Sequence, residues 1–285
     1  MNKKISSLNP SVCAVKQSWD FTFTYILREL SRTGCILLFI FFLPHTVLAQ
    51  NDVEDFFKTG GDVYTAPFHF DKDDWTNLSI TAAAATGAFF LDKPVKRLFL
   101  RNKNAAADFI FEIDKYFYIE GTAISMAGIY AYGAAADDKE IKNLGLQLAE
   151  ATFFASTIML ISKAISGRSR PNSHCGPLNF NPFTTDLKNS SMLSAHSTLA
   201  FAFSTVMANY KDDTAWRTGW YTLSSLVAMA RIYHNMHWFS DVVLGSALGY
   251  FVGEFVSNHR TNKKADESIL VVPPPQNLVS FKLPF

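Results

Sequence analysis

The sequence predicts an all-α protein, an antiparallel helical bundle of about six core helices. Two observations support this class. Apolar segments of helical length follow one another along the chain, with polar loops between them. The chain has 285 residues, of which 48% are hydrophobic and 18% charged, so it can bury one substantial core. The expected helices lie near residues 78–91, 121–136, 146–165, 197–208, 219–232 and 242–256.

The chain begins with a segment that is typical of an export signal. Basic residues precede the apolar run 35–43, and Val47-Leu48-Ala49 offers small residues for cleavage before Gln50. We therefore expect residues 1–49 to be a signal peptide. The alternative is an uncleaved N-terminal membrane anchor.

The remaining chain divides into three parts. Residues 50–76 are expected to form an N-terminal extension, and residues 77–258 the helical domain itself. The composition changes after Arg260, where charged residues are followed by three consecutive prolines at 273–275. Residues 259–285 are therefore predicted to form an extended C-terminal tail.

Three clusters of charged and titratable residues stand out in the second half of the chain. Lys163 is followed, after six residues, by Arg170 and Pro171. The other two clusters are Ser194-Ala195-His196 and the set Arg231, His237 and Asp241, with five and three residues between its members. A phosphoryl transition state spreads negative charge over three oxygens, which fixed cations stabilise. Arginine adds a fork that matches two phosphate oxygens, and lysine adds a compact point charge.

This pattern resembles the signature of the type 2 phosphatidic acid phosphatases (PAP2), which share their site with bacterial class A acid phosphatases and vanadium haloperoxidases. The resemblance covers roughly residues 146–256. The first motif is complete, and every charged or titratable position of the signature is matched. Leu193 replaces a proline, Ala195 a glycine and Ala230 a serine. The resemblance implies a PAP2/haloperoxidase-type bundle with its active site at one pole.

The resemblance also implies roles. His237 would attack phosphorus and form a phosphohistidine. Asp241 comes four residues later, on the same face if the segment is helical, and would hold the other ring nitrogen of His237. His196 would protonate the leaving alkoxide, as an imidazole with a pKa of ~6.5 can. The residues implied to bind phosphate are Lys163, Arg170, Ser194, Ala195 and Arg231. No metal ion is implied.

The order of the predicted helices gives an independent argument for one site. Lys163 and Arg231 lie at the ends of predicted helices, whereas His196 and Asp241 lie at the starts of the following ones. In an antiparallel bundle these four positions meet at one pole. The polar connection 168–192 then forms a loop over that pole.

The histidines and Arg168 allow two other interpretations. His234 and His237 could be two ligands of a metal site with His174 as the third, but no nearby carboxylate cluster completes the shell. Arg168 lies within the first motif and is expected to be solvated rather than catalytic.

Charge and segment length bear on the setting of the protein. A net charge of +1 argues against a nucleic-acid partner. A membrane-spanning helix needs about 20 apolar residues, and several of these segments are shorter and rich in small residues. We favour a membrane-associated envelope protein with its site facing outward. A soluble periplasmic bundle is the alternative.

The function that the sequence favours is metal-independent hydrolysis of phosphate monoesters or pyrophosphates, preferably lipid phosphates. A soluble non-specific acid phosphatase is one alternative. A vanadate-dependent haloperoxidase is a second, in which vanadate would be a prosthetic group rather than an inhibitor. The third is a catalytically inactive anion-binding bundle, suggested by Leu193, Ala195 and Ala230.

Overall fold

The computed structural model describes residues 50–173, 175–184 and 186–270, and within them the protein is helical without a strand. An isolated bridge between Arg168 and Phe180 is the one extended pairing in this part of the chain. The predicted all-α class is confirmed. The predicted signal peptide or anchor at 1–49 and the proline-rich end of the tail lie outside the described residues.

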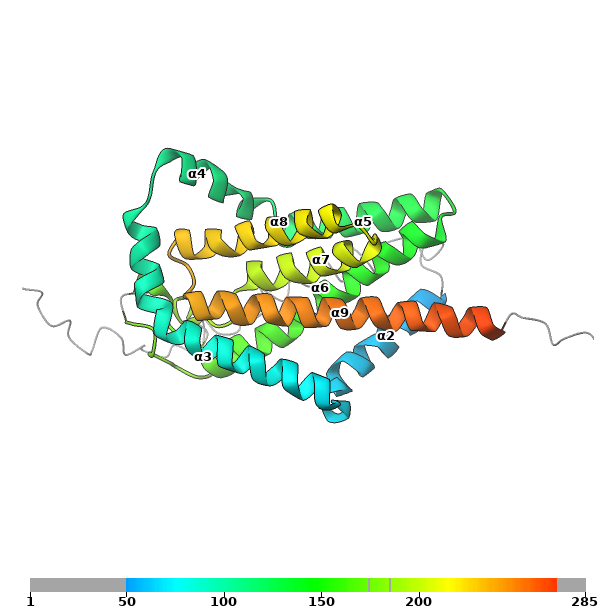
Figure 1. Ribbon diagram of the computed structural model, residues 1–285, viewed down its shortest axis with the longest axis horizontal. Coiled ribbons are helices and arrows are strands. Elements are labelled where there is room, and N and C mark those ends of the chain that lie inside the picture. Colours follow the sequence, from blue (N-terminus) through cyan, green and yellow to red (C-terminus); the bar gives the residue numbers. More distant parts are fainter. Residues whose placement is uncertain (1–49, 174, 185, 271–285) are drawn as a thin grey trace, which may run out of the picture.

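The core is a bundle of long helices that run alongside one another (Figure 1). They are α5 (Ile119–Ala135), α6 (Lys139–Ser166), α7 (Ala195–Tyr210), α8 (Thr214–Tyr233) and α9 (Phe239–Leu270). α7 is the central helix, because it packs against α6, α8 and α9. The main apolar cluster lies between these helices and includes Leu148, Phe154, Phe203, Val206 and Val256.

α7 and α9 approach closely because small residues face each other. A Cβ atom at Gly249 of α9 would lie 2.3 Å from the carbonyl oxygen of Thr198 in α7, which is far inside van der Waals contact. Only glycine therefore fits at this crossing. The close contact positions the start of α9 beside the start of α7, where the predicted site residues lie.

Two helices precede the bundle and pack on its outside (Figure 1). α2 (Gln50–Thr65) contacts α6 and α9, and α3 (Lys72–Arg101) contacts α9 and α8. α3 is longer than the predicted 78–91 because Asp71 and Asp74 form a capping box at its start. The short helices α4 (Ala105–Phe111) and η3 (Glu112–Lys115) then lead into α5.

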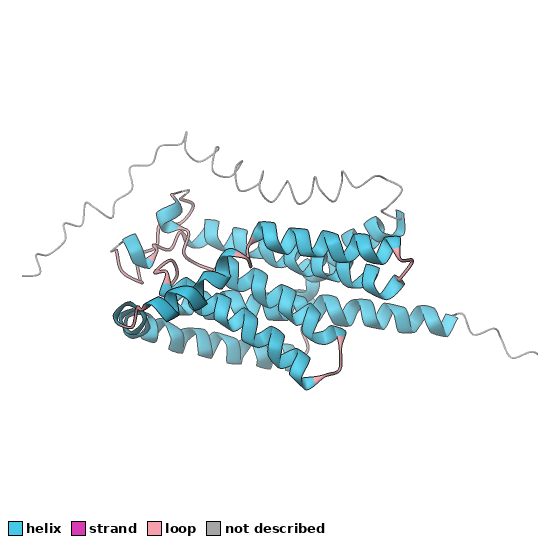
Figure 2. Ribbon diagram, turned by 90° about the horizontal axis from the view of Figure 1, so that it is seen from above, coloured by secondary structure: helices cyan, strands magenta, loops and turns pink. Residues whose placement is uncertain are grey.

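α6 ends at Gly167, which has a φ angle of 53° in the left-handed region. Its amide donates to the carbonyl of Lys163, and a Cβ atom here would lie 1.6 Å from the carbonyl oxygen of Asn181. Glycine is thus required by both conformation and space. The chain then crosses the end of the bundle through η4 (Pro171–Ser173) and η5 (Leu187–Asn189), and Figure 2 shows most of the loops gathered at this end. The predicted loop over one pole is confirmed.

The predicted extended tail is wrong in its first half. α9 continues without a break to Leu270, past the predicted boundary at residue 259. Residues 261–270 include lysine, alanine, glutamate and leucine, which favour a helix, and the first proline comes only at Pro273.

A buried ion pair joins α6 to α9 at the end of the bundle opposite the loops. Arg260 of α9 donates through Nε to Glu150 at 2.8 Å and through Nη2 at 2.5 Å. Its Nη1 donates to Asn143 at 2.9 Å. Glu150 is completely buried, so its charge requires this partner.

Among the described residues, two segments are long and apolar enough to cross a membrane, Lys139–Ser166 and Phe239–Arg260. Their apolar windows are 56% and 44% buried within the protein, as expected for core helices of a bundle, which meet the same criterion.

Candidate active site

A pocket of about 340 Å³ lies at the looped end of the bundle, where α6 ends and α7 begins. Most of the predicted site residues line it together: Lys163, Arg170, Ala195, His196, Arg231 and His237. The antiparallel order of the helices thus gathers residues up to 74 positions apart, as the sequence predicted. Ser194 and Asp241 lie behind this lining and are completely buried.

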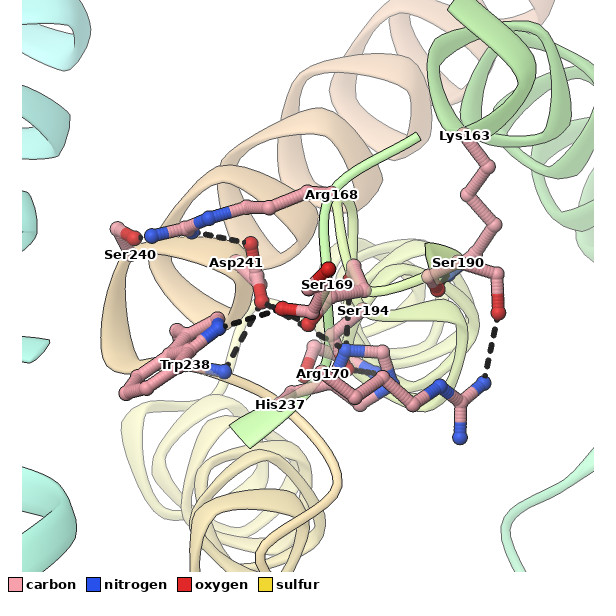
Figure 3. Close-up of polar contacts among 12 residues, drawn as sticks. Lys163, Arg168, Ser169, Arg170, Ser190, Ser194, His237, Trp238, Ser240 and Asp241 are labelled. Atoms are coloured by element: carbon pink, nitrogen blue, oxygen red, sulfur yellow. Dashed lines mark hydrogen bonds and ion pairs between the residues drawn. The ribbon is translucent and has the colours of Figure 1, made fainter. Parts of the chain in front are cut away.

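Ser190 fixes two of the cationic side chains. Lys163 Nζ donates to the carbonyl oxygen of Ser190 at 2.6 Å, and Arg170 Nη2 donates to the Ser190 hydroxyl at 3.0 Å (Figure 3). Because both charges are already held beside the pocket, little reorganisation is needed when an anion binds.

The third cation, Arg231, ends α8 and is held from another direction. Its Nη1 forms an ion pair with Asp114 of η3, a carboxylate that is only 3% exposed. Its buried Nε has no hydrogen-bond partner among the described residues. Arg231 is therefore oriented by Asp114 and retains a donor for a bound anion.

His237 lies in the turn between α8 and α9 and is 3% exposed. Its Nδ1 is 2.7 Å from the carbonyl oxygen of Ser191. A carbonyl can only accept, so Nδ1 carries the hydrogen and Nε2 of the neutral ring keeps its lone pair. Burial lowers the pKa of His237 well below its ordinary value, and the nearby cations Lys163, Arg170 and Arg231 lower it further. The ring is thus held neutral.

The predicted direct contact between Asp241 and His237 is wrong. The nearest Asp241 oxygen is 3.9 Å from His237 Nδ1, beyond hydrogen-bond distance. The expectation assumed that both residues lie on one helix, but α9 begins at Phe239 and His237 precedes it. Asp241 instead accepts from the Trp238 amide at 2.9 Å and from the Ser191 hydroxyl at 2.5 Å (Figure 3).

The expectation that Arg168 is solvated is also wrong. Its side chain is completely buried and forms ion pairs with two carboxylates at 2.6 Å, Asp92 of α3 and Asp241 of α9. The guanidinium also lies over the ring of Phe89, with 4.5 Å between Cζ and the ring centroid. Arg168 points away from the pocket and into the contact between α3 and α9 (Figure 3).

His196 occupies the first turn of α7 on another side of the pocket. Its ring stacks on Tyr118, with 4.2 Å between the centroids and an interplanar angle of 9°. Burial lowers the pKa of His196 well below its ordinary value, and the charges of Arg231, Lys163 and Arg170 add to this effect. An imidazole whose pKa is lowered in this way is neutral near pH 7.

Ser194 and Ala195 start α7. Ser194 is the N-cap, and its hydroxyl accepts from the amide and the hydroxyl of Ser197. It therefore stabilises the helix start, and its predicted phosphate contact finds no support in the pocket lining. Ala195 lines the pocket as predicted, and it has no positive φ angle that would require the glycine of the family signature.

The pocket also has apolar lining from α5, α6 and α7, which we call its apolar arm. This apolar arm is lined by Ile119, Met126, Phe153, Met159, Leu160 and Leu199, and Thr122, Thr152 and Ser156 line the same pocket. Large apolar side chains are also exposed at the looped end of the bundle. They are Ile161, Ile165, Leu178 and Phe183, each more than half exposed. The site thus combines a cationic end with apolar surroundings.

The metal-site alternative rested on His174, which lies outside the described residues. His234, its second member, donates through Nε2 to the carbonyl of Phe111 at 3.1 Å and lies 3.6 Å from Asp114. It therefore shares Asp114 with Arg231 and does not line the pocket.

Sequence reasoning missed several residues that hold the site together: Asp92, Asp114, Tyr118, Ser190 and Ser191. One signal was available for Asp92. It follows an apolar run that includes Phe89, Phe90 and Leu91, and a carboxylate on a buried helix face requires a cationic partner. The partner, Arg168, is 76 positions away and has no local signal.

Comparison with known proteins gives three results. Residues 144–264 match the family model described as PAP2 superfamily. A 63-residue segment is 40% identical to the lipid A 1-phosphatase of Porphyromonas gingivalis, which amounts to 21% of this chain and 14% of that protein. The chain thus matches about one seventh of that relative's length. The crystal structure of Aquifex aeolicus LpxE is similar to this structure, with a TM-score of 0.46 and 17% sequence identity. The similarity covers 59% of this chain and 95% of the LpxE chain.

Proposed function

We propose that this chain, whose residues 144–264 match the PAP2 superfamily model, is a phosphatase that hydrolyses lipid phosphates through a phosphohistidine on His237. The observation that carries the proposal is a neutral, oriented imidazole in one pocket with three cations. The apolar arm beside those cations supports an amphiphilic substrate rather than a small soluble ester.

In the first step, Nε2 of His237 attacks phosphorus while the bond between phosphorus and the ester oxygen breaks. Lys163, Arg170 and Arg231 stabilise the charge on the phosphoryl oxygens. The leaving alkoxide takes a proton from His196. The phosphate dianion offsets the cations that lower the pKa of His196 in the free protein, so substrate binding itself favours the protonated ring.

In the second step, water attacks the phosphohistidine and the bond between nitrogen and phosphorus breaks. His196, now neutral, accepts a proton from that water. Inorganic phosphate leaves, and His237 regains its lone pair while Nδ1–H stays bonded to the Ser191 carbonyl. No metal ion or other cofactor has a role in this sequence, because side-chain cations supply the positive charge.

The proposed setting is the cell envelope, with the protein associated with a membrane and the site outside the cytoplasm. The exposed apolar side chains at the looped end, among them Ile161, Leu178 and Phe183, support contact between this end and lipid. The predicted export signal supports the compartment.

The test is phosphate release by the full-length protein in EDTA from a panel of substrates. The panel contains phosphatidate, phosphatidylglycerol phosphate, a polyprenyl pyrophosphate, lipid A and a chromogenic aryl phosphate. We expect long-chain lipid phosphates to be hydrolysed with a higher kcat/KM than the aryl ester, and vanadate to inhibit. Equal or better turnover of the soluble ester would favour a non-specific acid phosphatase. No turnover of any substrate and no vanadate binding would indicate an inactive bundle.

A further inference from the structure

Behind the pocket lies a buried chain of charged and polar groups that begins outside the family match. Asp92 of α3 accepts from Arg168 Nη2 at 2.6 Å through Oδ2, and Arg168 Nη1 donates to Asp241 Oδ1 at 2.6 Å. Asp241 Oδ2 accepts from the Ser191 hydroxyl. The Ser191 carbonyl in turn accepts from His237 Nδ1. A continuous path of hydrogen bonds therefore links α3 to the proposed nucleophile.

Every member of this path is nearly or completely buried. Asp92, Arg168, Ser191 and Asp241 are at most 1% exposed, and His237 is 3% exposed. Charges in such a place are costly unless each is paired and hydrogen-bonded, so their arrangement is strongly specified. Arg168 also donates through Nε to the Pro177 carbonyl at 2.8 Å, which leaves it no freedom to rotate.

Ser191 connects this path to the pocket, because its amide, hydroxyl and carbonyl groups all form hydrogen bonds. Its amide donates to the Arg168 carbonyl at 2.9 Å and its hydroxyl donates to Asp241 at 2.5 Å. Its carbonyl is therefore fixed in direction, and it meets His237 Nδ1 at 2.7 Å. A change in Arg168 or Asp241 alters the direction of this carbonyl and, through it, the direction of Nε2.

We infer that Asp92 and Arg168 are positioning residues for His237, which act through Asp241 and the Ser191 carbonyl to fix its tautomer and aim its Nε2. The catalytic consequence rests on the proposed function, but the effect on the tautomer does not. Asp92 holds Arg168 in the orientation that Asp241 requires, and it also accepts from the Ser240 amide at 2.9 Å at the start of α9. α3 is thus part of the working site.

The test compares Asp92→Asn with a matched control at the other end of the bundle, Glu150→Gln. Both remove one buried carboxylate charge and leave an arginine with a weakened partner. The full-length protein is labelled with ¹⁵N-histidine, and the ring nitrogen shifts of His237 report the tautomer without any substrate. We expect Asp92→Asn to change these shifts and Glu150→Gln to leave them as in the wild type.

A second variant avoids any change in buried charge. Ser191→Ala removes the hydroxyl that bonds to Asp241 but keeps the carbonyl that accepts from His237. We expect Ser191→Ala to move the ring nitrogen shifts of His237 in the same direction as Asp92→Asn does, but by a smaller amount. Arg168→Lys, which keeps the charge, should restore the wild-type tautomer more closely than Arg168→Gln.

Kinetics give the second readout. Misaligned reacting groups slow chemistry by about ten- to a hundredfold, so Asp92→Asn should lower kcat by that factor with little change in KM. Wild-type shifts in both Asp92→Asn and Ser191→Ala would overturn the inference. The inference would also be overturned if Glu150→Gln changed the His237 shifts as much as Asp92→Asn does, because any loss of a buried carboxylate would then disturb the site. A wild type without phosphatase activity would refute the proposed function but leave the tautomer result to decide the positioning role.

Discussion

The bundle contains two buried arginines, one near each end, that join distant segments through carboxylates. Arg168 at the looped end is shared by Asp92 and Asp241, whereas Arg260 at the opposite end is held by Glu150 and Asn143. Their anchor points on α9, Asp241 and Arg260, are about 28 Å apart along the helix. The Arg168 cluster continues by hydrogen bonds through Ser191 to His237 in the pocket.

A buried arginine–carboxylate pair can therefore have either of two effects. It can only stabilise the fold, or it can also orient a residue of the pocket. At the Arg260 end, a broken ion pair affects only the packing of α6 against α9. At the Arg168 end, the same change also reaches His237 through Ser191. The two ends should therefore respond differently to equivalent substitutions.

The largest difference between the ends is expected for their histidines. His237→Ala should abolish turnover, because it removes the Nε2 that we propose attacks phosphorus, and it should also abolish acid-labile incorporation of labelled phosphate. The control is His259→Ala at the opposite end, where His259 lies 3.4 Å from Asp62. Label that persists in His237→Ala would remove His237 from this role.

Glu150→Gln should lower the stability of the protein without changing its activity. Breaking a buried ion pair costs about 3–5 kcal/mol, so the free energy of unfolding should fall by that amount in denaturant titration. The kcat and KM of the folded variant should equal those of the wild type. A kcat that differs from the wild-type value in the folded variant would show that the Arg260 end also affects the pocket.

Arg170→Lys should lower kcat/KM ten- to a hundredfold. A two-pronged contact with phosphate becomes a single one, and a charge-assisted hydrogen bond is worth about 1.5–3 kcal/mol. The matched control is Arg217→Lys, at an exposed arginine of the opposite end. Unchanged kinetics in Arg170→Lys would place Arg170 outside the phosphate-binding set.

A pH effect on stability is expected at the pocket. Burial and nearby cations lower the pKa values of His196 and His237 in the folded protein. Below a pH of about 6.5, the unfolded chain therefore binds more protons than the folded protein does. The free energy of unfolding should decrease in that range. Inorganic phosphate should raise the pKa of His196 and reduce this loss. The measurement is an NMR titration of the histidine rings in phosphate and in chloride at equal ionic strength, and identical curves would contradict it.

The smallest effect is expected for Ala195→Gly. The Cβ atom of Ala195 narrows the approach to the first amides of α7 without removing a donor, so its loss should preserve the rate and vanadate affinity or raise them a few fold. Ala215→Gly, in the first turn of α8 at the other end, controls for the lower helix propensity of glycine. A wild type with neither turnover nor vanadate affinity, unrescued by this change, would indicate an inactive bundle.

The sequence predicted the fold and most of the pocket because both depend on local signals. Apolar periodicity located the core helices, and their antiparallel order placed Lys163, His196 and Arg231 at one end. Cap residues set the true boundaries, as Asp71 does for α3. The roles assigned to these residues in the reaction remain predictions.

The rest depends on contacts between distant positions. Whether Arg168 is solvated or buried is decided by Asp92 and Asp241, which lie 76 and 73 positions away. The spacing of His237 and Asp241 suggested a shared helix face, but the start of α9 at Phe239 breaks that relation. Neither fact has a signature in the local sequence.

Asp92 also bears on where a functional fragment can begin. The family match starts at residue 144, yet the carboxylate that holds Arg168 belongs to α3, far upstream. A fragment of residues 144–264 would contain every motif residue and still lack this support. If the chain is cut in the exposed turn at 102–104, the two pieces should regain activity only on reassociation. Recovered turnover would then report complementation between α3 and the bundle.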